Sequence, residues 1–191
     1  MPSSTDSRAA LAFLETSEAT DGARTLLEVE LAPGGGTMPH RHLTRPVRLE
    51  VLEGSLSLQI GREVLRLEAG ESATAPATVT YRVANRSGVP ARFRIDLTPG
   101  HEGFEQAVRV GRGLARDGLV RRDGAPRRLY HLAVLAQWSE IEVSGPLAAL
   151  APLLGPVARD ARSKGVDREL LERYAGQETY AENDRLRTAG T

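Results

Sequence analysis

The feature that most constrains the fold is a series of short runs, between about residues 24 and 97, in which apolar and polar residues alternate. In residues 27–31 and again in residues 56–60, every second side chain is apolar, which places these side chains on one face of a β-strand. Turn sequences that contain glycine separate the runs; they are residues 34–36, 53–54, 60–61, 69–70 and 87–90. Many short strands with frequent turns predict a mainly β chain that folds as an antiparallel barrel or sandwich.

Beyond Pro99 the apolar spacing changes to that of a helix. Apolar and small residues recur there every three or four positions, and residues 129–138 are apolar on nearly every side, which predicts a buried helix. We therefore divide the chain into an N-terminal arm (residues 1–20), a β-barrel (21–100), a helical extension (101–175) and a polar tail (176–191). The extension either folds over the open end of the barrel or packs outside it, where it would serve oligomerisation or stability.

Composition restricts the partners and the compartment. The 191 residues include 25 Lys and Arg against 25 Asp and Glu, so no net charge draws the chain to nucleic acid or to acidic membranes. Without cysteine it has no disulfide, thiolate metal ligand or cysteine nucleophile. The apolar stretch 147–158 contains Pro152, Gly155 and Pro156 and falls short of the roughly 20 residues of a membrane span. We expect a cytoplasmic protein that binds neither nucleic acid nor membranes.

Two histidines carry the clearest chemical signal. His40 and His42 are separated by one residue, so on a strand both imidazoles point to the same face and can reach one point inside a barrel. Gly34 precedes the pair and Gly54 follows it. Imidazoles placed in this way can bind a metal ion or exchange protons with a ligand.

These residues resemble the first signature of the cupin superfamily, Gly-x5-His-x-His-x(3–4)-Glu-x6-Gly. Gly70, Pro76 and Asn85 match the second signature, Gly-x5-Pro-x-Gly-x2-His-x3-Asn. The resemblance covers about residues 24–98 and implies an antiparallel double-stranded β-helix, or jelly-roll, barrel with an α-helical C-terminal extension. Residues 13–16 and 131–135 also resemble an uncharacterised bacterial branch of single-barrel cupins with a helical tail, for which no reaction is known.

The chain departs from the signatures at two ligand positions. In metal-binding cupins a glutamate and a third histidine complete the site, but the aligned residues here are Val47 and Tyr81, and Thr78 replaces a signature glycine. Glu50 is no obvious substitute, because it shares the outer strand face with Arg48. Two imidazoles hold a divalent ion weakly. We therefore expect no cofactor, or at most a weakly bound divalent metal on the two histidines.

The same resemblance implies that His40, His42 and Tyr81 are the catalytic residues of a barrel pocket. An imidazole can accept a proton near neutral pH and a phenol can donate one. Thr44 and Arg45 follow the histidines at the expected pocket mouth, where Arg45 either holds a carboxylate or phosphate or is simply exposed. Apolar side chains form the expected substrate-binding walls; they are Val47, Leu49, Val51, Leu58 and Val83.

Three functions are compatible with these residues. The first is an enzyme that uses metal-independent acid–base chemistry for isomerisation, dehydration or cyclisation of a small organic molecule. The second is a non-catalytic ligand-binding or sensory cupin, in which Tyr81 is a packing residue. The third is a metal-dependent cupin with a reduced site of two histidines. His101 and His131 are weaker candidates, and the resemblance implies a homodimer, with which an outward-facing Leu52 is consistent.

Overall fold

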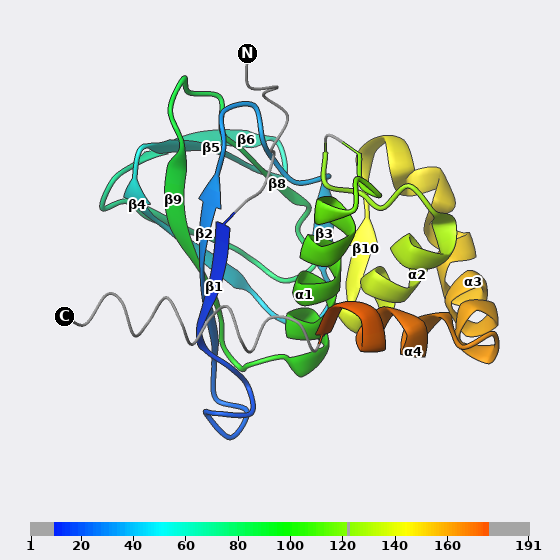
Figure 1. Ribbon diagram of the computed structural model, residues 1–191. Helices are drawn as coiled ribbons and strands as arrows, with labels where there is room; N and C mark the ends of the chain where they lie inside the picture. The colour runs from blue at the N-terminus through cyan, green and yellow to red at the C-terminus, as the bar shows by residue number, and fades with distance from the viewer. Residues whose placement is uncertain (1–9, 122, 176–191) are drawn as a thin grey trace, which may run out of the picture.

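The computed structural model describes residues 10–121 and 123–175, in which the strands form two antiparallel sheets (Figure 1). The strands are β1 (Ala10–Glu15), β2 (Thr25–Leu31), β3 (His40–His42), β4 (Val47–Glu53), β5 (Ser55–Ile60), β6 (Glu63–Glu68), β7 (Ser72–Ala75), β8 (Tyr81–Ala84), β9 (Ala91–Leu97) and β10 (Ile141–Val143). One sheet has the order β1-β2-β9-β4-β7 and the other the order β10-β3-β8-β5-β6. The predicted β-barrel with a helical C-terminal extension is confirmed.

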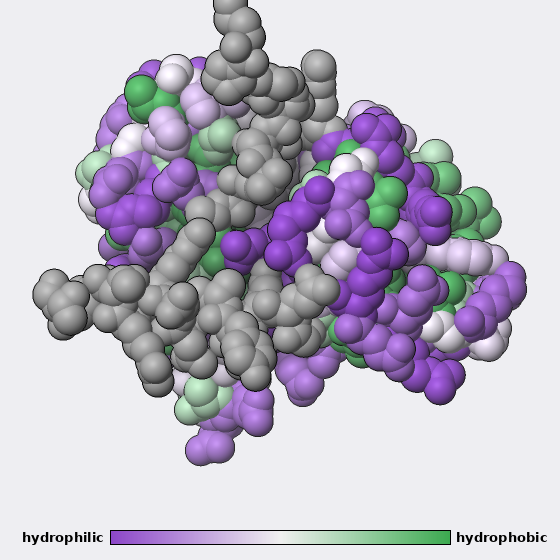
Figure 2. All heavy atoms as spheres, viewed as in Figure 1, coloured by the Kyte–Doolittle hydropathy of each residue, from purple (hydrophilic) through white to green (hydrophobic). Residues whose placement is uncertain are grey.

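The helices gather on one side of the barrel (Figure 1). They are α1 (Glu102–Arg116), α2 (Leu129–Trp138), the 3-10 helix η1 (Gly145–Leu150), α3 (Ala151–Ser163), α4 (Val166–Leu170) and the π-helical turn η2 (Leu171–Ala175). The buried helix expected at residues 129–138 is therefore confirmed. Figure 2 shows mainly hydrophilic side chains on the face that the helices present in this view. Among the described residues, none of the helices combines the length and hydrophobicity of a membrane span.

Strand β4 shows how the alternation builds the core. Val47, Leu49 and Val51 are each at most 1% exposed and lie between the sheets. Arg48 and Glu50 lie on the other face, where Arg48 Nη1 donates to Glu50 Oε2 at 3.1 Å. Full burial of one such aliphatic side chain contributes about 1.5–3 kcal/mol. The period of two thus fixes which face of the strand looks into the barrel.

Left-handed backbone turns explain why the signature glycines are present. The φ angles of Gly34, Gly54 and Gly70 are 77°, 74° and 87°, values that side chains other than glycine rarely adopt. A Cβ at Gly54 would lie 2.8 Å from the carbonyl oxygen of Pro90. Thr78, which stands at a signature glycine position, keeps the left-handed conformation with φ 65°, and its N–H donates to the carbonyl of His42.

Asn85 of the second signature has a structural role. Its side chain is 1% exposed, and Nδ2 donates to the carbonyl oxygens of Leu31 and Val89, both at 2.8 Å. Its Oδ1 accepts hydrogen bonds from the backbone N–H and the hydroxyl of Ser87. One buried amide therefore holds the end of β2 and the turn before β9 together.

The helical extension is fastened to the barrel by a strand and by a buried carboxylate. Strand β10 pairs with β3 at the edge of its sheet. On α1, Phe104 and Val108 pack against the barrel core. Glu105, which is 2% exposed, accepts hydrogen bonds from the N–H of Ser17 at 2.6 Å and from the hydroxyl of Thr25 at 2.5 Å.

Strand pairing crosses two of the predicted boundaries. Strand β1 precedes residue 21 and joins the barrel sheet beside β2, and β10 follows residue 100 and joins the other sheet. The boundaries at residues 20, 100 and 175 stay predictions. The polar tail, residues 176–191, lies outside the described residues, as do residues 1–9 of the arm.

Candidate functional site

The structure brings together the three rings that the sequence singles out. His40 on β3 lies directly opposite Tyr81 on β8, and the centroids of their rings are 4.6 Å apart. His42 lies two residues along β3, with its ring centroid 5.5 Å from that of His40 and 6.0 Å from that of Tyr81. Strand pairing and the period of two together produce this cluster.

The hydrogen bonds of His40 fix its tautomer. Its Nδ1 lies 2.8 Å from the carbonyl oxygen of Met38; because a carbonyl only accepts, Nδ1 carries the proton. In the neutral ring, Nε2 is then an acceptor, and it lies 3.2 Å from the hydroxyl oxygen of Tyr81. The hydroxyl of Tyr81 therefore donates a hydrogen bond to Nε2 of His40.

Burial keeps both partners of this hydrogen bond neutral. Removal from water lowers the pKa of His40, although the bond to the Met38 carbonyl opposes this effect. Burial raises the pKa of Tyr81, which is 6% exposed. A low dielectric disfavours both imidazolium and phenolate, so at neutral pH the pair consists of an imidazole and a phenol.

His42 is a buried imidazole whose hydrogen-bonding capacity is unused. It is 3% exposed, and neither ring nitrogen has a hydrogen-bond partner among the described residues. Burial, and after it the neighbouring His40, His101 and Arg45, lower its pKa to about 3. An unsatisfied buried polar group costs about 1–3 kcal/mol. Buried polar groups are normally hydrogen-bonded. A ligand that bonds to the ring of His42 would supply the missing partner.

Helix α1 covers the barrel at this point. The ring of Phe104 packs against the ring of His42, with centroids 5.7 Å apart. Since Phe104 also belongs to the side chains packed against the barrel core, the extension covers the end of the barrel where His42 lies. The same extension also adds β10 at the edge of the sheet beside β3, and a role in oligomerisation or stability stays a prediction.

Thr44 and Arg45 both contact Glu140, a residue that sequence reasoning missed. The exposed hydroxyl of Thr44 donates to Glu140 Oε2 at 2.5 Å, and Arg45 Nη1 lies 3.4 Å from the same oxygen. His101 Nε2 lies 3.8 Å from Glu140 Oε1. Glu140 follows helix α2 with φ 51°; no motif marks it, because only the docking of the extension brings it here.

Comparison with known proteins agrees with this architecture. The cupin domain family matches residues 27–98. The barrel of this chain is a cupin domain. The resemblance to the cupin superfamily, which the two histidines and the glycines first indicated, is thus confirmed.

Among relatives, the cupin domain is similar to the tetracenomycin polyketide synthase protein TcmJ of Streptomyces glaucescens, with 35% identity over 71 residues. The match covers 37% of this chain and 48% of TcmJ, so the chain spans about half the length of that curated relative. Two solved structures are also similar. The protein TT1209 from Thermus thermophilus has a TM-score of 0.45 and 25% identity, over 50% of this chain and 87% of that one. KdgF from Halomonas sp. has a TM-score of 0.46 and 14% identity, over 52% and 88%.

The predicted walls of the pocket belong to the core of the cupin domain. They are buried in the same cluster as Tyr81; the side chains are Val47, Leu49, Val51, Leu58 and Val83, each at most 2% exposed. Their position keeps water away from the phenol. Contact with a substrate stays a prediction for all five.

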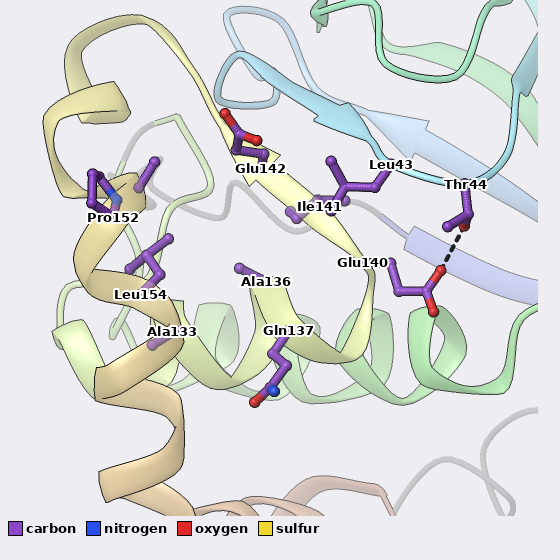
Figure 3. Close-up of a pocket in the computed structure, with 12 residues that line it drawn as sticks. Leu43, Thr44, Ala133, Ala136, Gln137, Glu140, Ile141, Glu142, Pro152 and Leu154 are labelled. Atoms are coloured by element: carbon purple, nitrogen blue, oxygen red, sulfur yellow. Dashed lines mark hydrogen bonds between the residues drawn. The ribbon is translucent and has the colours of Figure 1, made fainter.

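A groove of about 670 Å³ lies between β10, α2 and α3, and Leu43 and Thr44 of the barrel also line it. Figure 3 shows Thr44 and Glu140 facing each other at one end of it and Pro152 and Leu154 of α3 at the other. Thr44 is the residue that this groove shares with the predicted site. Its remaining lining comes from Leu43 and from the extension, which the cupin signatures do not cover.

The donor set does not fit a tightly held metal. Among the residues that the structure describes, no three His, Cys, Asp or Glu side chains come together in a way that would hold an ion. Both nitrogens of His40 are engaged, by Met38 and by Tyr81, and Glu50 pairs with Arg48 on the outer face. Structural and catalytic metal sites normally use three or four protein ligands.

Proposed function

We propose that the cupin domain is an enzyme that moves protons on a small organic molecule, without a tightly held metal, at the site of His40, His42 and Tyr81. The observation that carries the proposal is the hydrogen bond from Tyr81 to a neutral His40, beside the imidazole of His42, whose two nitrogens have no partner in the described part of the chain. An acid–base site needs a group that accepts or donates a proton, placed next to a polar group that can bind the substrate. The cupin fold alone would not support this proposal, because one fold serves many functions.

The hydrogen bond supplies a two-step route for a proton. Tyr81 Oη accepts a proton from the substrate while its own proton passes to Nε2 of His40. Because burial raises the pKa of Tyr81, a free phenolate is unfavourable, and the two transfers are expected to occur together. The resulting imidazolium keeps its Nδ1–H bond to the Met38 carbonyl. Return of the proton to another substrate atom completes an isomerisation.

His42 is suited to binding rather than to proton abstraction. A pKa of about 3 keeps the ring neutral over the physiological range and makes it a weak base, because efficient general bases have a pKa near the working pH. Its ring N–H can donate to the oxygen on which negative charge develops when the substrate loses its proton. A donor fixed in a water-poor site stabilises such an oxygen strongly.

The substrate class that suits this chemistry is an enolisable carbonyl compound. Loss of a proton beside a carbonyl places charge on its oxygen, which His42 would stabilise, and the proton would enter the relay. The name of TcmJ links that relative to polyketide synthesis, and polyketide chains are rich in such C–H groups. Isomerisation, dehydration and cyclisation all begin with this step. We further propose a cytoplasmic homodimer acting on small molecules rather than on nucleic acid or membranes.

The proposal can be tested by proton exchange. Ethyl α-methylacetoacetate has one acidic C–H between two carbonyls, and its replacement by deuterium in heavy water is followed by NMR. We expect the protein to accelerate exchange over buffer, and Tyr81→Phe or His40→Asn to reduce the acceleration by about 100-fold or more. Tyr130→Phe is the matched control, because that phenol lies on α2 and bonds to Asp160 instead.

Other results would favour the other two functions. Binding of the probe without exchange in the unmodified protein would indicate a ligand-binding cupin. Exchange that disappears with a chelator and returns with a divalent metal would indicate the reduced metal site. Equal losses in Tyr81→Phe and Tyr130→Phe would contradict the relay.

A further inference from the structure

Buried nitrogens without hydrogen-bond partners concentrate at one place in the described structure. Eight such side-chain nitrogens occur among the described residues, and five of them belong to His42, Arg45 and His101. They are both ring nitrogens of His42, Nε and Nη1 of Arg45, and Nδ1 of His101. Buried polar atoms are normally hydrogen-bonded, so the concentration of these nitrogens points to a place where a ligand could bind.

The three side chains come from different parts of the chain and lie close enough to influence one another electrostatically. His42 ends β3, Arg45 follows it in the loop to β4, and His101 precedes α1. The positive charge of Arg45 contributes to the lowered pKa of His42 and, after burial, to that of His101. Arg45 and His101 side chains are each 15% exposed.

Glu140 does not saturate this cluster. Its carboxylate lies 3.4 Å from Arg45 Nη1 and 3.8 Å from His101 Nε2, without a hydrogen bond to either, and accepts one from Thr44. Arginine nitrogens can only donate, so the ligand must bring acceptor oxygens. Arg45 contributes one positive charge to the cluster, and Glu140 already offsets part of it. The cluster therefore suits a singly charged anion better than a dianion.

We propose that Arg45 and His101, beside His42, form a subsite for a carboxylate group of the substrate, which leaves the N–H of His42 for the reacting carbonyl. The inference rests on the proposed function and refines it: the substrate is an enolisable carbonyl compound that also carries a carboxylate. It gives the helical extension a part in substrate recognition, because His101 lies outside the match to the cupin domain family. The carboxylate is held next to His42 and thereby orients the reacting carbonyl toward Tyr81 and His40.

A pair of probes of equal shape tests the subsite. The carboxymethyl ester of α-methylacetoacetic acid is an anion, and the carbamoylmethyl ester is its neutral match. Dissociation constants for the full chain are measured by titration calorimetry. We expect the anion to bind at least about tenfold more tightly, as for a hydrogen bond to a charged group, and the preference to fall in Arg45→Gln.

Two further variants keep the test decisive. Arg48→Gln removes an exposed arginine that pairs with Glu50 and should leave the preference unchanged. His101→Leu should lower the preference several-fold and decides the matter if Arg45→Gln fails to fold. Equal affinity for the two esters, or equal effects of Arg45→Gln and Arg48→Gln, would overturn the subsite.

The outcomes also separate the subsite from the proposed function. Deuterium exchange of the neutral ester without any preference for the anion would reject the carboxylate subsite and leave the proton relay in place. Preferential binding of the anion without exchange of either ester would reject the relay and leave the subsite in place.

Discussion

Tyr81 and His40 face each other across two neighbouring strands, and the phenol hydroxyl donates a hydrogen bond to Nε2 of the imidazole over 3.2 Å. The tyrosine occupies the position where metal-binding cupins have a histidine. With that replacement, a metal ligand becomes a proton donor to one of the two histidines that are retained. This hydrogen bond is the physical basis of the proposed proton chemistry.

The first prediction concerns the metal. Because His40 has no free nitrogen and no carboxylate among the described residues joins the histidines, protein purified without chelator should contain far less than one metal ion per chain. Elemental analysis of the purified protein, with a buffer blank, measures this directly. One zinc, iron, manganese or nickel ion per chain that is lost in His42→Ala would contradict the expectation.

The second prediction concerns stability in acid. The pKa of His42 is about 3 in the folded chain and near 6.5 when unfolded, so below pH 6.5 the unfolded state binds a proton that the folded state does not. The free energy of unfolding should therefore decrease as pH falls, by about 2 kcal/mol between pH 7 and pH 5 from this group. The lowered pKa of His40 acts in the same direction.

Urea unfolding at several pH values measures this dependence. In His42→Leu the decrease between pH 7 and pH 5 should be smaller than in the unmodified protein. An unchanged slope would mean that His42 titrates normally and is not buried as described.

The third prediction is a stabilising substitution at Thr78. This threonine has φ 65°, a conformation that disfavours branched side chains. Thr78→Gly should raise the free energy of unfolding by about 1 kcal/mol, after the greater freedom of glycine in the unfolded chain is allowed for. Thr74→Gly, in strand β7, is the control and should destabilise. Loss of stability in both variants would contradict the strain at residue 78.

The fourth prediction concerns Asn85. Its amide bonds to two backbone carbonyls and to Ser87 inside the protein, so Asn85→Ala leaves several buried groups without partners. We expect a loss of about 3 kcal/mol in chemical unfolding. Gln59→Ala, at an exposed amide on β5, should change stability little. A loss below that caused by Gln59→Ala would refute the role of Asn85.

The sequence predicts those parts of the molecule that depend on local spacing. The alternation in β4 predicted the inward face of Val47, and the single residue between the histidines placed both rings on one side of β3. Glu140 and His101 reach the site only because α1 and β10 dock on the barrel. Such docking depends on tertiary packing, for which no local pattern exists in the sequence. The groove beside α3 was not predicted for the same reason.

The tautomer of His40 is the most direct test of the proton relay, and nitrogen NMR of isotope-labelled imidazoles measures it. We predict that His40 is neutral at pH 7, with the proton on Nδ1 and an unprotonated Nε2. The resonance of Nε2 should shift in Tyr81→Phe, because that substitution removes its hydrogen-bond donor. A proton on Nε2, or a His40 ring that is charged at this pH, would contradict donation from Tyr81 and with it the proposed chemistry.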